Sequence, residues 1–284
     1  MNAVAIDPRD VQQRVQELPA LAKAVQEVVR ALNDDDLDLE AIARRIAVDP
    51  AMVSKILRAA NSPFYGVSGH VGSVQHAVRL IGVRTAGTLV TAASIMRTVS
   101  APSGAAFDFH RFWAHSLATA VCSQELAREC RYPATGAFLA GLLHDIGQVA
   151  LATYYPQEFA TAMLHAHERD CPLYQAEDEV LSLNHAQVGA WIAEHWHFTS
   201  DVSQAIGAHH IPGAASETGL ATAADIVHAA DGIVHALDLL AVPGELVPPL
   251  EVRAWQRLGI QPHGFHRVFE RSVSTFEALR QALL

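Results

Sequence analysis

The sequence predicts an all-helical protein, and three observations support that prediction. Apolar residues recur three and four positions apart along most of the chain, which is the spacing of an amphipathic helix; residues 74–81 are one example. Proline directly follows a capping residue at Asp7-Pro8 and Asp49-Pro50, as it does at helix starts. Strand-like alternation is scarce, and hairpin turns such as Asn-Gly between alternating apolar runs are absent.

In the first hundred residues, turn and capping residues separate a series of short helices. Three helices are expected to begin at Pro8, at Pro50 and after the capping residue Ser73. Three more are expected from Pro19 to about Leu32, from Leu39 to Ala47, and from about Arg84 to Val99. The small and turn-forming residues at 101–105 then predict a linker.

A long helix at about residues 109–130 is expected to open the second half. Further helices are expected near residues 135–154, after Pro156 and Pro172, at 185–196, at 200–210 and at about 220–240, with proline-punctuated helices at the C-terminus. We therefore expect two helical lobes: an N-terminal lobe at residues 1–100, the linker at 101–105, and a second lobe at residues 106–284.

The composition narrows the classes of function. Lys plus Arg total 20 and Asp plus Glu total 30, a net charge of −10, so nucleic acid and anionic membrane surfaces repel the chain as a whole. The three cysteines form no CxxC pair, which argues against a zinc finger and for reduced thiols. No basic start followed by an apolar run marks a leader, and the apolar runs are too short to span a bilayer. We expect a cytoplasmic protein with neither a membrane nor a nucleic-acid partner.

Histidine is frequent and unevenly placed, since 12 of the 16 histidines lie between His110 and His235. The sharpest local signal is His144-Asp145, an adjacent pair within an apolar stretch that we expect to be helical. A buried carboxylate is costly unless it is paired or bound to metal, and imidazole together with carboxylate suits zinc, iron or manganese. Taken alone, the pair is a weak signal, and a satisfied pair in the core is the simpler interpretation.

Similar polar residues recur on successive predicted helices whose other periodic positions are apolar. Along the chain they are His115, His144-Asp145, His185, His209-His210 and Asp231. Scattered core histidines would not be expected to reproduce this order. The series resembles the HD superfamily of metal-dependent phosphohydrolases, and its tail resembles the HD-GYP branch, which hydrolyses cyclic di-GMP. The resemblance implies that these seven residues are candidate ligands of one or two divalent metal ions (Fe, Mn or Zn), which would activate a water molecule.

Two departures from the HD-GYP pattern matter. That branch typically carries a lysine after His-Asp-Ile-Gly, where it can help to hold phosphate, whereas this chain has Gln148. The Gly-Tyr-Pro signature after the His-His pair is also absent, because residues 211–217 read Ile-Pro-Gly-Ala-Ala-Ser-Glu. Hydrolysis of cyclic di-GMP is therefore not expected, and no residue is assigned as catalytic. Whether the series binds metal, and whether bound metal supports turnover, stays open.

The first half contains more specific motifs. The chain resembles the HDOD family at Leu18–Leu21, Asp49–Gly66, Ser73–Gly82, Phe112–Ser116 and Leu142–Gly147. The resemblance extends over about Leu18 to Leu240 and implies a two-lobed helical module that serves as a regulatory or scaffolding output domain, often without demonstrated catalysis. We therefore expect a bacterial signalling protein that binds a protein partner. The groove between the lobes is the expected place for that partner or for a small ligand.

The sequence leaves two alternative functions open and contains one further pair of histidines on a predicted helix. The first alternative is an active metal-dependent phosphohydrolase, which the retained ligand series supports. The second is DNA binding, because residues 39–60 could form a helix-turn-helix with several basic residues; we favour ordinary helix packing, since the second helix is largely apolar. His228 and His235 are seven residues apart on one helix face, and we interpret them as a packed or solvated stripe rather than as a second site.

Overall fold

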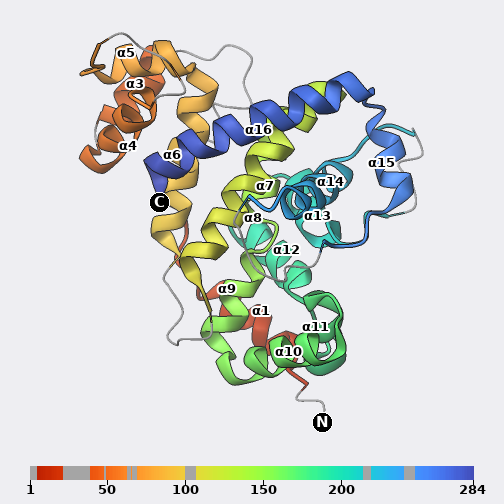
Figure 1. The fold of residues 1–284 in the computed structure, drawn as a ribbon. Helices are drawn as coiled ribbons and strands as arrows, with labels where there is room; N and C mark the ends of the chain where they lie inside the picture. Colours follow the sequence, from red (N-terminus) through yellow and green to blue (C-terminus); the bar gives the residue numbers. More distant parts are fainter. Residues whose placement is uncertain are drawn as a thin grey trace. The chain divides into compact units, whose positions relative to one another are not determined.

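A computed structural model describes residues 5–21, 39–47, 49–62, 65, 69–99, 107–213, 219–239 and 247–284. The regular secondary structure in these ranges is helical throughout, which confirms the predicted all-α class (Figure 1). Contacts between residues divide the chain into two compact units, one of Met1–Ala20 with Ala101–Phe265 and the other of Leu21–Ser100 with His266–Leu284. Most of the helix expected from Pro19 to Leu32 and the linker expected at 101–105 lie outside the described residues, so a division at that linker stays a prediction.

In the first unit, helices α7 (Phe109–Cys130), α8 (Ala134–Leu143) and α14 (Ala223–Ala236) form the centre, and the other helices pack around them. These other helices are α1 (Pro8–Gln16), α9 (Ile146–Tyr154), α10 (Pro156–Arg169), α11 (Leu173–Leu181), α12 (His185–His195), α13 (Ser200–Ala208) and α15 (Val252–Leu258). Helices α7, α8 and α14 pack against one another, and α12 packs against α9 and α13. From Phe112 to Ala127, α7 is buried at almost every position, so it forms the core on which the site is assembled.

The most apolar part of this core is the segment Ala134–Tyr154. By length and hydropathy this segment could cross a membrane, but 78% of its most apolar window is buried inside the fold. Burial in the core therefore accounts for the apolar composition of this segment. The helix expected here is interrupted at the His-Asp pair, because α8 ends at Leu143 and α9 begins at Ile146. His144 and Asp145 thus occupy a turn between two helices, and our expectation that they lie within one continuous helix was wrong.

Residues 5–20 belong to the first unit. Asp7 caps α1 by accepting a hydrogen bond from the Arg9 amide at 2.9 Å, with Pro8 at the first helical position, as predicted. Leu18 and Pro19, which follow α1, contact the C-terminal end of α12. The Leu18 carbonyl lies 3.1 Å from Nε2 of His195, and the Pro19 carbonyl accepts a 3.1 Å hydrogen bond from the indole of Trp196. The Leu-Pro motif therefore fixes the N-terminal segment to the end of a helix that carries a candidate ligand.

The second unit is also helical. Its helices are α3 (Leu39–Ala47), α4 (Pro50–Ala60), α5 (Val74–Ile81), α6 (Val83–Thr98) and the larger part of α16 (Pro262–Leu283). Asp49 caps α4, and Ser73 caps α5, as the sequence predicts. Helix α4 buries its apolar face, and Lys55 donates a 3.2 Å hydrogen bond to the carbonyl of Leu283 within the same unit. These contacts support the packing interpretation of residues 39–60.

Candidate metal centre

All seven predicted ligands lie in the first unit, where five separate elements carry them into one cluster. They are His115 on α7, His144 and Asp145 in the turn between α8 and α9, His185 at the start of α12, His209 and His210 after α13, and Asp231 on α14. The side chains of these seven residues are buried or nearly so. The structure therefore brings together residues that are up to 116 positions apart in the sequence.

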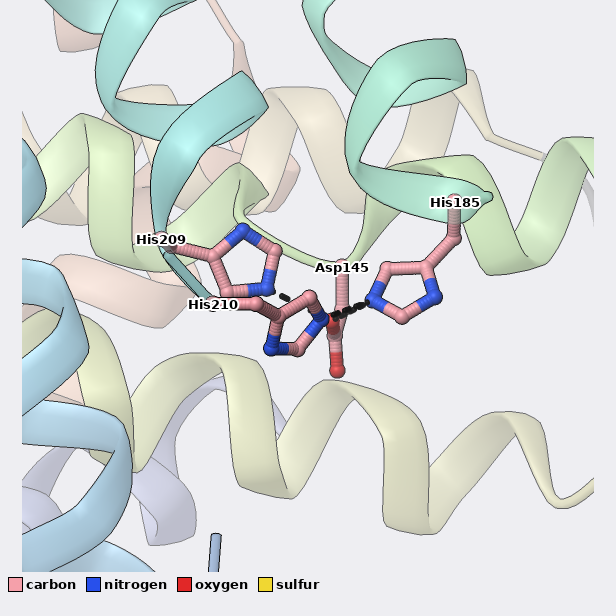
Figure 2. A group of neighbouring side chains, drawn as sticks. All are labelled: Asp145, His185, His209 and His210. Carbon is pink, nitrogen blue, oxygen red and sulfur yellow. Dashed lines mark hydrogen bonds and ion pairs between the residues drawn. The ribbon is translucent and has the colours of Figure 1, made fainter. Parts of the chain in front are cut away.

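Asp145 lies at the centre of the first group of ligand atoms, which is drawn in Figure 2. Its Oδ1 is 3.1 Å from Nε2 of His185 and 3.5 Å from Nε2 of His209, and these two histidines approach it from different helices (Figure 2). His210 completes the group, because its Nε2 lies 2.7 Å from Nε2 of His185. These four residues each offer one atom to a space that would accommodate a metal ion.

A second group continues from the other oxygen of Asp145. Nε2 of His144 lies 3.4 Å from Asp145 Oδ2, 3.3 Å from Nε2 of His115 and 3.7 Å from Asp231 Oδ1. His115 is itself 3.0 Å from Asp231 Oδ1 through Nε2. The carboxylate of Asp145 is thus shared between two groups of donors, and this arrangement suits a pair of neighbouring metal ions.

Hydrogen bonds outside the cluster fix which nitrogen of each ring faces inward. Nδ1 of His144 is 2.8 Å from the Gly141 carbonyl, and Nδ1 of His209 is 2.7 Å from the Ile206 carbonyl. A carbonyl oxygen only accepts, so both Nδ1 atoms must carry the proton, which leaves the lone pair of the neutral ring on Nε2. Histidine ligands of metals are held in this way by carbonyl or carboxylate partners.

His185 is held by a carboxylate instead. Glu177 on α11 is fully buried, and its Oε2 lies 2.6 Å from Nδ1 of His185 and accepts a 2.8 Å hydrogen bond from the His185 amide. Burial by itself lowers the pKa of His185, but the flanking carboxylates of Glu177 and Asp145 outweigh it and raise that pKa to about 10. In the metal-free protein, His185 therefore carries a proton on the nitrogen that a metal would need.

The pKa shifts of His144, His210, Asp145 and Asp231 favour the protonation states of metal ligands. Burial lowers the pKa of His144 to about 4, although Asp145 and Asp231 oppose this effect, and burial also holds the pKa of His210 well below its usual value. Burial raises the pKa of Asp145 and Asp231, but the surrounding histidines more than offset it and hold both well below the ordinary value. Neutral imidazoles and ionised carboxylates are the forms that bind metal.

The unsatisfied atoms in the cluster fit a pair of cations. Nε2 of His209 is buried and makes no hydrogen bond within the described residues. Nε2 of His115 lies 3.3 Å from Nε2 of His144 and 3.0 Å from Asp231 Oδ1, so these three atoms face the same small space. Donor atoms on one zinc ion, with bonds of about 2.0–2.2 Å, lie roughly 3 Å apart. The spacing within each group agrees with this value, so the residues fit divalent metal binding.

Close helix packing sets the position of His185. Gly147, in the first turn of α9, lies so near α12 that a Cβ atom built on it would be 2.0 Å from the carbonyl oxygen of His185 and 2.9 Å from the amide nitrogen of Gly189. Only glycine fits this crossing. The glycine of the His-Asp-Ile-Gly motif thus brings the start of α12 up to the turn that carries Asp145.

Two residues near the centre, Glu177 and His235, were not among the predicted ligands. Glu177 gave no motif signal, because it is one of several acidic residues on a short helix and its burial depends on the fold. His235 was interpreted from its spacing to His228 as part of a packed or solvated stripe, but it also follows Asp231 by four residues, so both lie on one face of α14. Nε2 of His235 is 3.3 Å from Asp231 Oδ1. His228, by contrast, has a packing role, because its ring bridges the His209 carbonyl and the Glu251 amide.

Comparison with known proteins agrees with this architecture. A candidate phosphohydrolase from Shewanella amazonensis SB2B is 26% identical, with a TM-score of 0.72 over 95% of this chain and 97% of that one. An HDOD domain protein from Geobacter sulfurreducens is 21% identical, with a TM-score of 0.77 over 98% of this chain and all of that one, and shows the same fold. A curated Treponema pallidum relative is 25% identical over 199 residues, and this match spans 69% of this chain and 38% of that protein.

The family assignment rests on the sequence match to a known domain. Residues 18–212 match the HDOD domain. The match includes the Leu18-Pro19 contact with α12 and every candidate ligand except Asp231. Because it covers more than half of the chain, this protein belongs to the HDOD domain family.

Proposed function

We propose that this HDOD chain is a signalling protein that holds two divalent metal ions in the His/Asp centre and binds a phosphate ester there. The observation that carries the proposal is the convergence of two buried donor groups on the single carboxylate of Asp145. His185, His209 and His210 would hold one ion, and His115, His144 and Asp231 the other. Imidazole and carboxylate donors suit zinc, iron or manganese.

Bound metal would supply positive charge for the oxygens of a phosphate group. The chain offers no obvious substitute for that charge next to the motif, because Gln148 stands where the related hydrolases carry lysine. Phosphate binding should therefore depend wholly on the metal. As expected from the HDOD resemblance, we propose that the liganded state is read by a protein partner, which makes the chain a regulator.

Hydrolysis of the bound ester is the second candidate. A carboxylate shared between two metals is typical of two-metal phosphohydrolases, where the ions orient and activate the attacking water. The 26% identical relative from Shewanella amazonensis is described as a candidate phosphohydrolase. Both observations support testing turnover together with binding.

The test begins with metal loading of the purified chain with manganese, zinc or ferrous iron, followed by elemental analysis and by titration with inorganic phosphate. We expect two ions per chain, and phosphate binding only in the metal-loaded form. The double variant His144→Ala, Asp145→Ala should lose both properties. The control is His110→Ala, which removes an exposed histidine on α7, the helix that also carries His115.

Three outcomes are informative. Release of nitrophenol from bis(p-nitrophenyl) phosphate by the loaded wild type, but not by the double variant, would establish the second candidate. Phosphate binding without release would support the regulatory function. A folded wild-type chain that stays free of all three metals after loading would overturn the proposal, and the His/Asp cluster would then be a buried polar core.

A further inference from the structure

His235 lies beside the candidate metal centre although it is not one of the seven predicted ligands. It follows Asp231 by one turn of α14, and its Nε2 is 3.3 Å from Asp231 Oδ1. Its ring centroid is 4.7 Å from that of His115 on α7. Its side chain is 18% exposed, against 12% for His115, so it belongs to the same nearly buried layer.

The three donor atoms in this part of the cluster have the spacing of a metal-binding set. Nε2 of His115 is 3.0 Å from Asp231 Oδ1, and Nε2 of His235 is 3.3 Å from the same oxygen. All three lie within 4.8 Å of one another. Neighbouring donors on an ion with bonds of about 2.0–2.2 Å lie roughly 3 Å apart, so these positions fit one ion.

We infer that His235 is a direct ligand of the metal ion that His115 and Asp231 hold, an inference that rests on the two-metal centre proposed above. Together with His144, which the proposed centre assigns to the same ion, this gives three imidazoles and one carboxylate. A set rich in imidazole suits zinc and iron better than magnesium or calcium. His235 thus makes this position selective for the softer divalent ions.

A second role for His235 is a hydrogen bond from Nε2–H to Asp231, which would only orient the carboxylate. The two roles make different demands on the side chain. Glutamine at position 235 retains an N–H donor for Asp231 but is a poor ligand for these ions. A ligand role therefore predicts that His235→Gln and His235→Ala are equally damaging, whereas an orienting role predicts that His235→Gln is tolerated.

Cobalt(II) is a suitable probe, because the visible absorption of the ion reports its coordination and binding can be followed without any enzymatic activity. Wild type, His235→Ala, His235→Gln and the control His110→Ala are each titrated with cobalt, and circular dichroism confirms that each is folded. We expect two cobalt ions on the wild type and on the control. In both His235 variants, one ion should bind at least tenfold more weakly with a changed spectrum, while the other ion is unaffected.

Two results would overturn the inference and leave the two-metal centre intact. One is that both His235 variants bind two ions with wild-type affinity and spectrum. The other is that only His235→Ala is impaired, which would assign His235 to the orientation of Asp231. A wild type that takes up no cobalt would be a different failure, because it removes the proposed centre before any variant is compared.

Discussion

At the scale of single residues, Glu177 shows how burial gives a side chain its role. Its carboxylate has no exposure, and it contacts both the ring and the amide of His185. A carboxylate behind a histidine ligand orients the ring and increases its basicity. Glu177 does not reach the donor cluster itself, so it is a positioning residue.

We expect Glu177→Gln to weaken metal binding by about 10–100-fold while the fold is retained, because outer partners of ligands typically have effects of this size. Isothermal titration with zinc or cobalt measures the change. Glu179→Gln is the matched control, since Glu179 is on the same helix but pairs with His165 at 2.7 Å. Equal affinity in the wild type and in Glu177→Gln would show that the carboxylate does not support the ligand.

The proton on His185 predicts how metal binding depends on pH. The pKa of His185 is raised to about 10, so between pH 6 and 9 the metal-free ring is protonated and must lose a proton before Nε2 can bind metal. Raising the pH removes that competition, so affinity should increase by about tenfold per pH unit. Titrations with cobalt at several pH values test this expectation, and an affinity that is flat or falls with pH would contradict it.

At the scale of the elements, the crossing of α9 and α12 determines the shape of the site. A side chain at Gly147 would collide with the backbone of His185, which cannot rotate away as a flexible side chain can. The two helices would have to separate, and the distance of 3.1 Å between His185 Nε2 and Asp145 Oδ1 would increase.

We therefore expect Gly147→Ala to lower the free energy of unfolding by at least about 1–3 kcal/mol, the usual cost of overpacking, and to weaken metal binding as well. Gly136→Ala on α8 is the control, because a Cβ atom there meets nothing within 4 Å. That substitution should be neutral or stabilise by up to about 1 kcal/mol through helix propensity. Urea denaturation measures the free energy of unfolding of both variants. Equal values for Gly147→Ala and Gly136→Ala would refute the role of this crossing.

Several helices and the seven clustered residues were predicted from the sequence, whereas the turn at the His-Asp pair and the role of Glu177 were not. The spacing of apolar residues and the caps predicted α3 and α7 at their observed bounds. The interruption at His144-Asp145 was not predicted, because the segment is apolar and free of proline, and only the tertiary position of the two side chains reveals the turn. Glu177 was missed for the same reason, since nothing in its local sequence distinguishes a buried acid from an exposed one.

At the scale of the whole molecule, the centre connects elements that are distant in the chain. Its ligands come from α7, α12, α14, the turn after α8 and the end of α13. An ion bound to several of these elements binds the folded state and not the unfolded chain, so it stabilises the fold by mass action. Metal occupancy should thus change the stability of the first unit, and this is a physical means by which metal would influence the partner binding proposed above.

Removal of metal should therefore lower the melting temperature. One ion at a free concentration a hundredfold above its dissociation constant contributes about 2.7 kcal/mol. For a domain of this size that corresponds to roughly 5–10 °C in Tm. Differential scanning calorimetry with and without a chelator measures the shift, and the His144→Ala, Asp145→Ala variant should show none. Equal melting temperatures for the metal-loaded and the chelator-treated wild type would argue against an ion that joins these helices.

The most direct test of the central claim is anomalous diffraction from crystals of the zinc- or manganese-loaded chain. The account predicts two anomalous peaks on either side of Asp145, about 3.5–4 Å apart, as in other two-metal sites. One peak should lie among His185, His209 and His210, and the other near His115 and Asp231. Loaded crystals with no peak at Asp145, or with metal only on surface histidines, would contradict the account.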